Sequence, residues 1–152
     1  MNGYNGYTDN YLASQVNTAS PEQLMLMLYD GAVRFASLAI KAIEDEMPDK
    51  RSYYINKTYA ILSEFAVTLD RNQDAVLADN LDALYSYMQK CLMDANLKND
   101  PEPLTEVKEM LTGLRQTWAQ AIEINRQEQA TLGVDSPSPG RAADYKPLAA
   151  AI

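Results

Sequence analysis

The sequence predicts an all-α protein: an antiparallel up-down four-helix bundle with a short N-terminal helical cap. Apolar residues recur at intervals of three and four along four successive segments of the 152-residue chain, which is the spacing of one helix face. No window alternates apolar and polar residues in the way a half-buried strand does. Four amphipathic helices of about 20 to 30 residues, joined by short connections, favour an up-down bundle.

The first bundle helix has clear start and stop signals. It opens with Ser-Pro-Glu-Gln at 20–23, where the serine can cap, the proline suits the first helical position and the glutamine completes a capping box. Met47 and Pro48 interrupt the helix, so we expect it to end near Glu46.

The other three helices are bounded by polar or proline-containing stretches. The second should begin near Asp49, the third after the polar stretch 70–74, and the fourth at Asn99-Asp100-Pro101. Trp118 lies at a core position of the fourth helix, and its indole N–H will need an acceptor. The residues expected to hold the core are Leu28, Leu62, Phe65, Leu81, Leu84, Leu111, Leu114 and Trp118.

Residues 20–132 are expected to form the bundle, flanked by two segments with little capacity to pack. Residues 1–19 are predicted to be a mobile N-terminal segment that can make a short helical cap near 9–16. Residues 133–152 contain Ser-Pro-Ser-Pro-Gly at 136–140 followed by small side chains. That tail has too little apolar surface to offset its ordering entropy, so we predict that it is disordered.

The composition excludes several function classes. A net charge of −8 repels phosphate backbones and anionic lipid, so neither a nucleic acid nor a membrane is an expected partner. The chain has no histidine, which removes histidine-based catalysis and mixed Glu/His metal sites. No phosphate-binding glycine loop is present. We therefore expect no catalysis, no cofactor and no bound metal.

The single cysteine and the absence of a signal sequence favour the cytosol. Cys91 has no internal disulfide partner, which suits a reducing compartment, and it occupies a core position where a buried thiol is expected. The N-terminus is polar and rich in tyrosine, and the apolar run 24–29 is too short to cross a bilayer.

The first helix has more apolar surface than one core stripe requires. The run Leu-Met-Leu-Met-Leu-Tyr at 24–29 covers every direction around the helix. The N-terminal segment, another subunit or a client chain could shield the outward part. Gly31 lies inside this helix, where glycine is unfavourable, which indicates either tight packing within the bundle or close approach of a bound peptide.

The chain is rich in side chains that adapt to partners. Its ten tyrosines and seven methionines are residue types enriched at binding surfaces. Tyrosines of the N-terminal segment could lie in an apolar groove and leave when a better ligand arrives, which is a competition mechanism.

Several motifs occur in a characteristic order over about residues 7 to 125. The first is Tyr11, then Val16-Asn17-Thr18-Ala19-Ser20-Pro21-Glu22-Gln23-Leu24, then Leu26-Met27-Leu28-Tyr29-Asp30-Gly31. Shorter motifs follow it: Thr68-Leu69-Asp70, Asn80-Leu81, Leu84-Tyr85-x-Tyr87-Met88, Ala95-Asn96, and Leu114-Arg115-x2-Trp118. In these motifs the chain resembles the FliS family of flagellar export chaperones.

The resemblance implies a cytoplasmic chaperone that binds the disordered C-terminal segment of flagellin and blocks premature polymerisation. It also implies contact with the flagellar export gate when the chaperone is loaded. The client-binding groove would lie on the outer faces of the first two helices, lined by Met25, Leu26, Tyr29, Val33, Tyr54 and Ile61. The displaceable N-terminal cap would be formed by Tyr7, Tyr11, Leu12 and Val16.

Other functions remain open at the level of the sequence. The bundle could serve another export substrate or act as a helical scaffold for a regulator. It could also be a structural homo-oligomer whose extra apolar faces pair with each other.

Overall fold

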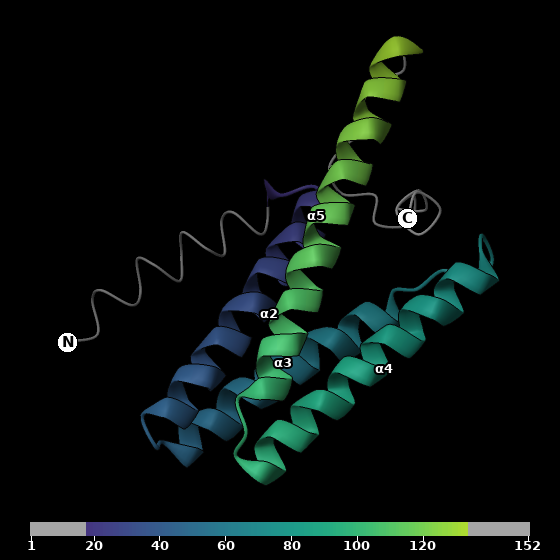
Figure 1. Cartoon of the computed structure of the whole chain (residues 1–152). Coiled ribbons are helices and arrows are strands. Elements are labelled where there is room, and N and C mark those ends of the chain that lie inside the picture. Colours follow the sequence, from purple (N-terminus) through teal and green to yellow (C-terminus); the bar gives the residue numbers. More distant parts are fainter. Residues whose placement is uncertain (1–17, 134–152) are drawn as a thin grey trace.

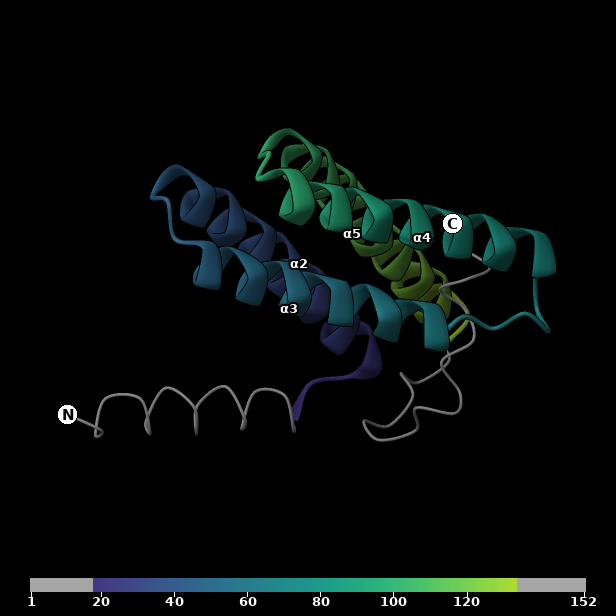
Figure 2. The same cartoon turned by 90° about the horizontal axis from the view of Figure 1, so that it is seen from below.

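A computed structural model of the protein describes residues 18–133, which form a bundle of four helices. The helices are α2 (Pro21–Glu44), α3 (Pro48–Val67), α4 (Ala75–Lys98) and α5 (Glu102–Thr131). They pack as a ring in which α2 and α4 each contact both α3 and α5. Consecutive helices run in opposite directions, as Figures 1 and 2 show from two sides. The predicted all-α four-helix bundle is confirmed, and residues 18–133 contain no strand.

The start of α2 is fixed by the predicted capping box. The Gln23 backbone N–H donates to Ser20 Oγ at 3.2 Å, and the Ser20 backbone N–H donates to Gln23 Oε1 at 3.1 Å. The helix ends at Glu44, slightly before the predicted end, because Glu46 adopts a left-handed φ of 56° and Pro48 then begins α3.

Side-chain and backbone caps also bound α4. The Asp74 carboxylate accepts a hydrogen bond from the Leu77 backbone N–H at 3.0 Å, which satisfies one of the free donors at the helix start. Asn99 closes the helix in the left-handed conformation with φ 52°, a geometry that asparagine tolerates better than most residues. The Asp100 carboxylate then accepts from the Glu102 backbone N–H at 3.0 Å, where α5 begins.

Most of the predicted core is confirmed. The residues that are buried as expected are Leu62, Phe65, Leu81, Leu111 and Trp118. Leu84 and Leu114 are half-buried and pack against the same cluster. The core therefore lies between all four helices, along the predicted stripes.

The prediction that Leu28 belongs to the core is wrong. Its side chain is 39% exposed. The buried stripe of α2 passes through Tyr29, Ala32, Ala36 and Ala39, and successive helix positions differ by about 100° in direction. Leu28 therefore points to the flank of the helix.

A buried polar contact joins α2 to α5. The Trp118 indole N–H donates to Tyr29 Oη at 2.6 Å, which supplies the acceptor that this residue was expected to need. The hydroxyls of Tyr29 and Tyr85 lie 3.4 Å apart, and burial raises the pKa of Tyr85. The Tyr29 ring stacks on Phe65 with centroids 4.4 Å apart. This cluster links all four helices through one group of side chains.

Cys91 is buried in α4, as predicted. Its side chain is 7% exposed and belongs to the core cluster. Burial raises the pKa of its thiol, so that the reactive thiolate is scarce at neutral pH. This environment is typical of a cysteine that packs as a small apolar residue.

We predict that Tyr29→Phe destabilises the bundle more than Tyr85→Phe. The first substitution removes the acceptor of a buried indole N–H, and an unsatisfied buried donor costs about 1–3 kcal/mol. The second removes only the longer hydroxyl contact, so its cost should stay below about 1 kcal/mol. Urea unfolding followed by the fluorescence of Trp118 measures both. Equal losses in the two variants would contradict this account.

We predict that Cys91 reacts slowly with a thiol reagent in the folded chain. Because the thiol is buried and its pKa is raised, labelling at pH 8 should be at least about tenfold slower than in urea-unfolded chain. A chromogenic disulfide reagent gives both rates. Equal rates would show that the thiol is accessible.

Candidate functional site

The large apolar side chains of α2 lie on its flanks. Its buried stripe consists mainly of alanines at 32, 36, 39 and 42, joined by Tyr29. The preceding residues 24–27 are all half-buried, and Leu28 is exposed. The helix therefore carries apolar surface on both sides of its core stripe, as its sequence indicates.

One flank of α2 faces α3 and forms what we call the α2–α3 seam. We define the seam by Leu24, Leu28, Gly31, Phe35 and Leu38 of α2 with Tyr54 and Ile61 of α3. The α2 members are spaced four, three, four and three apart, so they share one side of the helix. Phe35 and Tyr54 stack with centroids 6.2 Å apart, and a Cβ added to Gly31 would lie 3.8 Å from Ile61 Cδ1. These contacts place the α2 stripe against α3.

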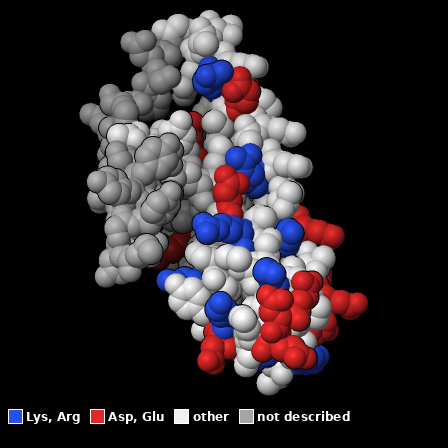
Figure 3. All heavy atoms as spheres, turned by 90° about the vertical axis from the view of Figure 1, so that its left-hand side faces the viewer, with Lys and Arg blue, Asp and Glu red and all other residues white. Residues whose placement is uncertain are grey.

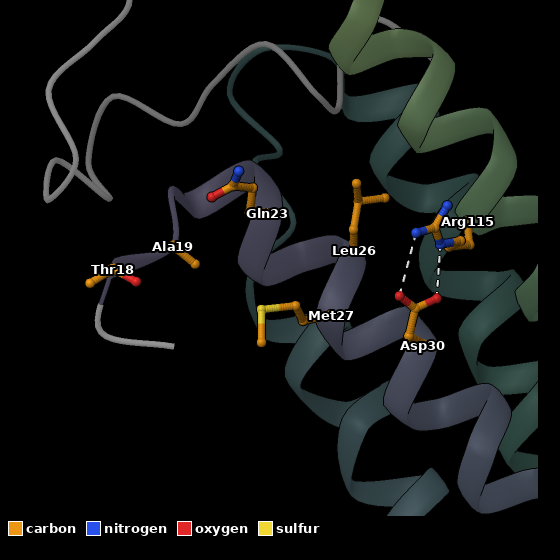
Figure 4. Close-up of a pocket in the computed structure, with 7 residues that line it drawn as sticks. All are labelled: Thr18, Ala19, Gln23, Leu26, Met27, Asp30 and Arg115. Carbon is orange, nitrogen blue, oxygen red and sulfur yellow. Dashed lines mark hydrogen bonds and ion pairs between the residues drawn. The ribbon is translucent and has the colours of Figure 1, made fainter. Parts of the chain in front are cut away.

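The other flank of α2 faces α5 and contains a pocket of about 420 Å³. An ion pair bridges the two helices there: Arg115 Nε donates to Asp30 Oδ1 at 2.8 Å and Arg115 Nη2 donates to Oδ2 at 3.4 Å. Figure 4 shows this pair at one end of the pocket and Met27 on the side of Thr18 and Ala19. The residues that line the pocket are Thr18, Ala19, Gln23, Leu26, Met27, Asp30 and Arg115.

Charge is distributed unevenly around these surfaces. The five α2 positions of the seam include no charged residue, whereas the chain as a whole carries −8. Figure 3 shows acidic and basic side chains together at the lower end of one face. The end of α2, the turn after it and the start of α3 contain four acidic and three basic residues: Glu44, Asp45, Glu46 and Asp49 with Lys41, Lys50 and Arg51. A seam without charged members suits a partner with an uncharged apolar stripe.

The residues expected to line a client groove lie on more than one surface. Tyr54 and Ile61 belong to the α2–α3 seam, whereas Leu26 lines the pocket beside α5. Met25 and Val33 are half-buried and pack against the core. The structure therefore divides the predicted set between two flanks of α2.

The prediction that Tyr29 lines an outward groove is wrong. Its side chain is fully buried, stacks on Phe65 and accepts the hydrogen bond of Trp118. The error is one helix position, because Leu28 was assigned to the core and Tyr29 to the surface. Around a helix that is apolar on all sides, the spacing of apolar residues does not fix which side faces inward.

The sequence contained a signal for the seam that the prediction did not use. Leu28, Phe35 and Leu38 follow each other at seven and three residues, and Leu24 and Gly31 complete the same stripe. The predicted cap residues Tyr7, Tyr11, Leu12 and Val16 lie outside the described residues.

Within residues 18–133, no group of three or more acidic or cysteine side chains is placed to hold a metal ion. No helix in this range is long and apolar enough to cross a membrane. The candidate functional surface is formed by the apolar flanks of α2, because they carry large apolar side chains that the rest of the bundle covers only in part.

Comparisons with known proteins agree on one family. Residues 3–125 match the model of the family described as flagellar protein FliS. The chain is 38% identical to the flagellar secretion chaperone FliS of Bacillus subtilis over 129 residues, which cover 85% of this chain and 92% of that protein. It is 36% identical to the protein of the same name from Campylobacter jejuni, with coverage of 76% and 87%. The Escherichia coli protein of that name is 31% identical, with coverage of 79% and 89%.

Proposed function

The chain belongs to the FliS family of flagellar secretion chaperones, and we propose that it binds the disordered C-terminal segment of flagellin in the cytosol. Binding would prevent premature polymerisation and help deliver the subunit to the flagellar type III export apparatus. A loaded chaperone would then contact the export gate. The proposed activity is binding alone and includes no covalent step.

The observation that supports this proposal is the uncharged apolar seam between α2 and α3. Leu28 is exposed there, and Phe35, Tyr54 and Ile61 are only half-buried. A disordered segment that folds into an amphipathic helix can bury its apolar stripe in such a groove, with anchors at intervals of three and four residues. The ordering entropy of the segment moderates the affinity, which keeps release at the export gate possible.

We expect flagellin to bind through its C-terminal region. Purified chain is titrated with intact flagellin and with flagellin lacking that region, and a peptide of the region is mixed in for circular dichroism. The peptide should gain helical signal, and removing the region should weaken binding at least about tenfold, since most of the buried apolar surface would be lost. Tight binding of the shortened flagellin would overturn the proposal.

A pair of substitutions tests whether the client binds on the seam. Leu28→Gln, on the seam, should weaken binding about tenfold, the effect of losing about 1.4 kcal/mol of apolar contact. Met93→Gln is the matched control, because Met93 is 57% exposed but lies on α4, away from α2. A stable dimer that flagellin does not dissociate would instead favour a structural homo-oligomer.

We also propose that residues 1–16 act as a displaceable cap over the client surface. Removing them should raise the association rate of flagellin or increase self-association, because apolar surface would be left uncovered. Stopped-flow mixing and sedimentation velocity measure the two effects. Unchanged behaviour in both would show that the segment is an inert tail.

A further inference from the structure

Gly31 lies in the middle of α2, where glycine weakens a helix. We infer that Gly31 is the point at which a client helix approaches the α2 backbone most closely. The inference rests on the proposed function and names the crossing point within the α2–α3 seam. Three observations support it: the space around Gly31, the side chains next to Gly31 and a comparison with Gly113.

The described residues 18–133 give no packing reason for a glycine at this position. A Cβ added to Gly31 would meet Ile61 Cδ1 at 3.8 Å, which is an ordinary van der Waals contact. The residue also has no left-handed backbone conformation, since Gly133 is the described glycine with a positive φ. Alanine would therefore fit in the bundle and strengthen the helix.

The neighbours of Gly31 form a surface that a helix can cover. Leu28 and Phe35 lie one turn away on either side along the same stripe, and Ile61 of α3 lies across from them. None of the five α2 seam residues is charged, although Arg34, three residues after Gly31, is exposed beside the strip. An occupant that matches this strip is an amphipathic helix with an uncharged apolar stripe, which is the form proposed for the flagellin segment.

Where two helices cross, a glycine at the contact allows the two helix axes to lie closer together. That distance depends on the side chains at the contact, and without a Cβ the partner backbone can come closer. Leu28 and Phe35 would then pack on both sides of the crossing point. A methyl group at Gly31 would push the partner away and loosen the contacts on either side.

Gly113 provides an internal comparison. It lies in α5, and a Cβ added there would meet nothing within 4 Å. Its helix neighbours Glu109, Gln116 and Thr117 are exposed and polar, and Met110 is apolar but half-buried, so that face offers no continuous apolar strip to a client. Both glycines therefore weaken the helix that contains them, but they differ in the side chains that surround them.

The test compares Gly31→Ala with Gly113→Ala in the full chain. Both substitutions should raise the thermal midpoint of unfolding by about 2 °C, because alanine is the better helix former. Gly31→Ala should weaken binding of intact flagellin at least about tenfold, whereas Gly113→Ala should change it less than about twofold. Calorimetric titration and thermal unfolding supply the two readouts.

The outcomes separate this inference from the proposed function. If Gly31→Ala bound flagellin as tightly as the wild-type chain does, the proposed crossing point would be wrong, whereas the proposed chaperone function would stand. A lowered thermal midpoint in Gly31→Ala would also overturn it, because the glycine would then serve packing in the free chain. Equal loss of binding in both variants would remove the special role of Gly31. Failure of the wild-type chain to bind flagellin would overturn the proposed function itself.

Discussion

The alanine stripe of α2 determines where this protein carries its apolar surface. Ala32, Ala36 and Ala39 are fully buried, so the side of α2 that faces the core is narrow and occupied by small side chains. The large apolar residues of the same helix consequently lie on its flanks, half-covered by α3 on one side and by α5 on the other.

The buried cluster around Tyr29 restricts how a client can bind. Tyr29, Trp118 and Tyr85 share hydroxyl and indole contacts in the core, and Phe65 stacks on the first of them. Opening the bundle would break a buried polar contact and expose four aromatic rings, which is costly. Binding on the outer flank of α2 avoids that cost. The packing of the core can therefore remain unchanged when a partner binds to the outer flank of α2.

The sequence predicted the helices well because their boundaries depend on local chemistry. The capping box at Ser20 and Gln23 and the break at Pro48 act within a few residues, and both occur as expected. The stripe of α3, at intervals of three and four residues, also gave Leu62 and Phe65 correctly as core. These features need no knowledge of the tertiary structure.

The site was harder to predict because it depends on how helices are rotated against each other. On α2 the apolar residues point in every direction, so Leu28 and Tyr29 were equally suited to the core from the sequence alone. Contacts with distant parts of the chain hold Tyr29 inside, among them the hydrogen bond from Trp118 on α5, which needs an acceptor. That partner is 89 residues away in the chain, beyond the range of any local pattern.

The net negative charge of the chain opposes self-association through the apolar seam. Two copies of a chain that carries −8 repel each other, and this repulsion opposes pairing of their seams at low salt. A client segment whose apolar stripe carries no charge experiences little of that repulsion. The same net charge therefore disfavours self-association more than it disfavours client binding. Raising the salt concentration screens the repulsion between copies, so self-association should respond to salt more strongly than binding of an uncharged stripe does.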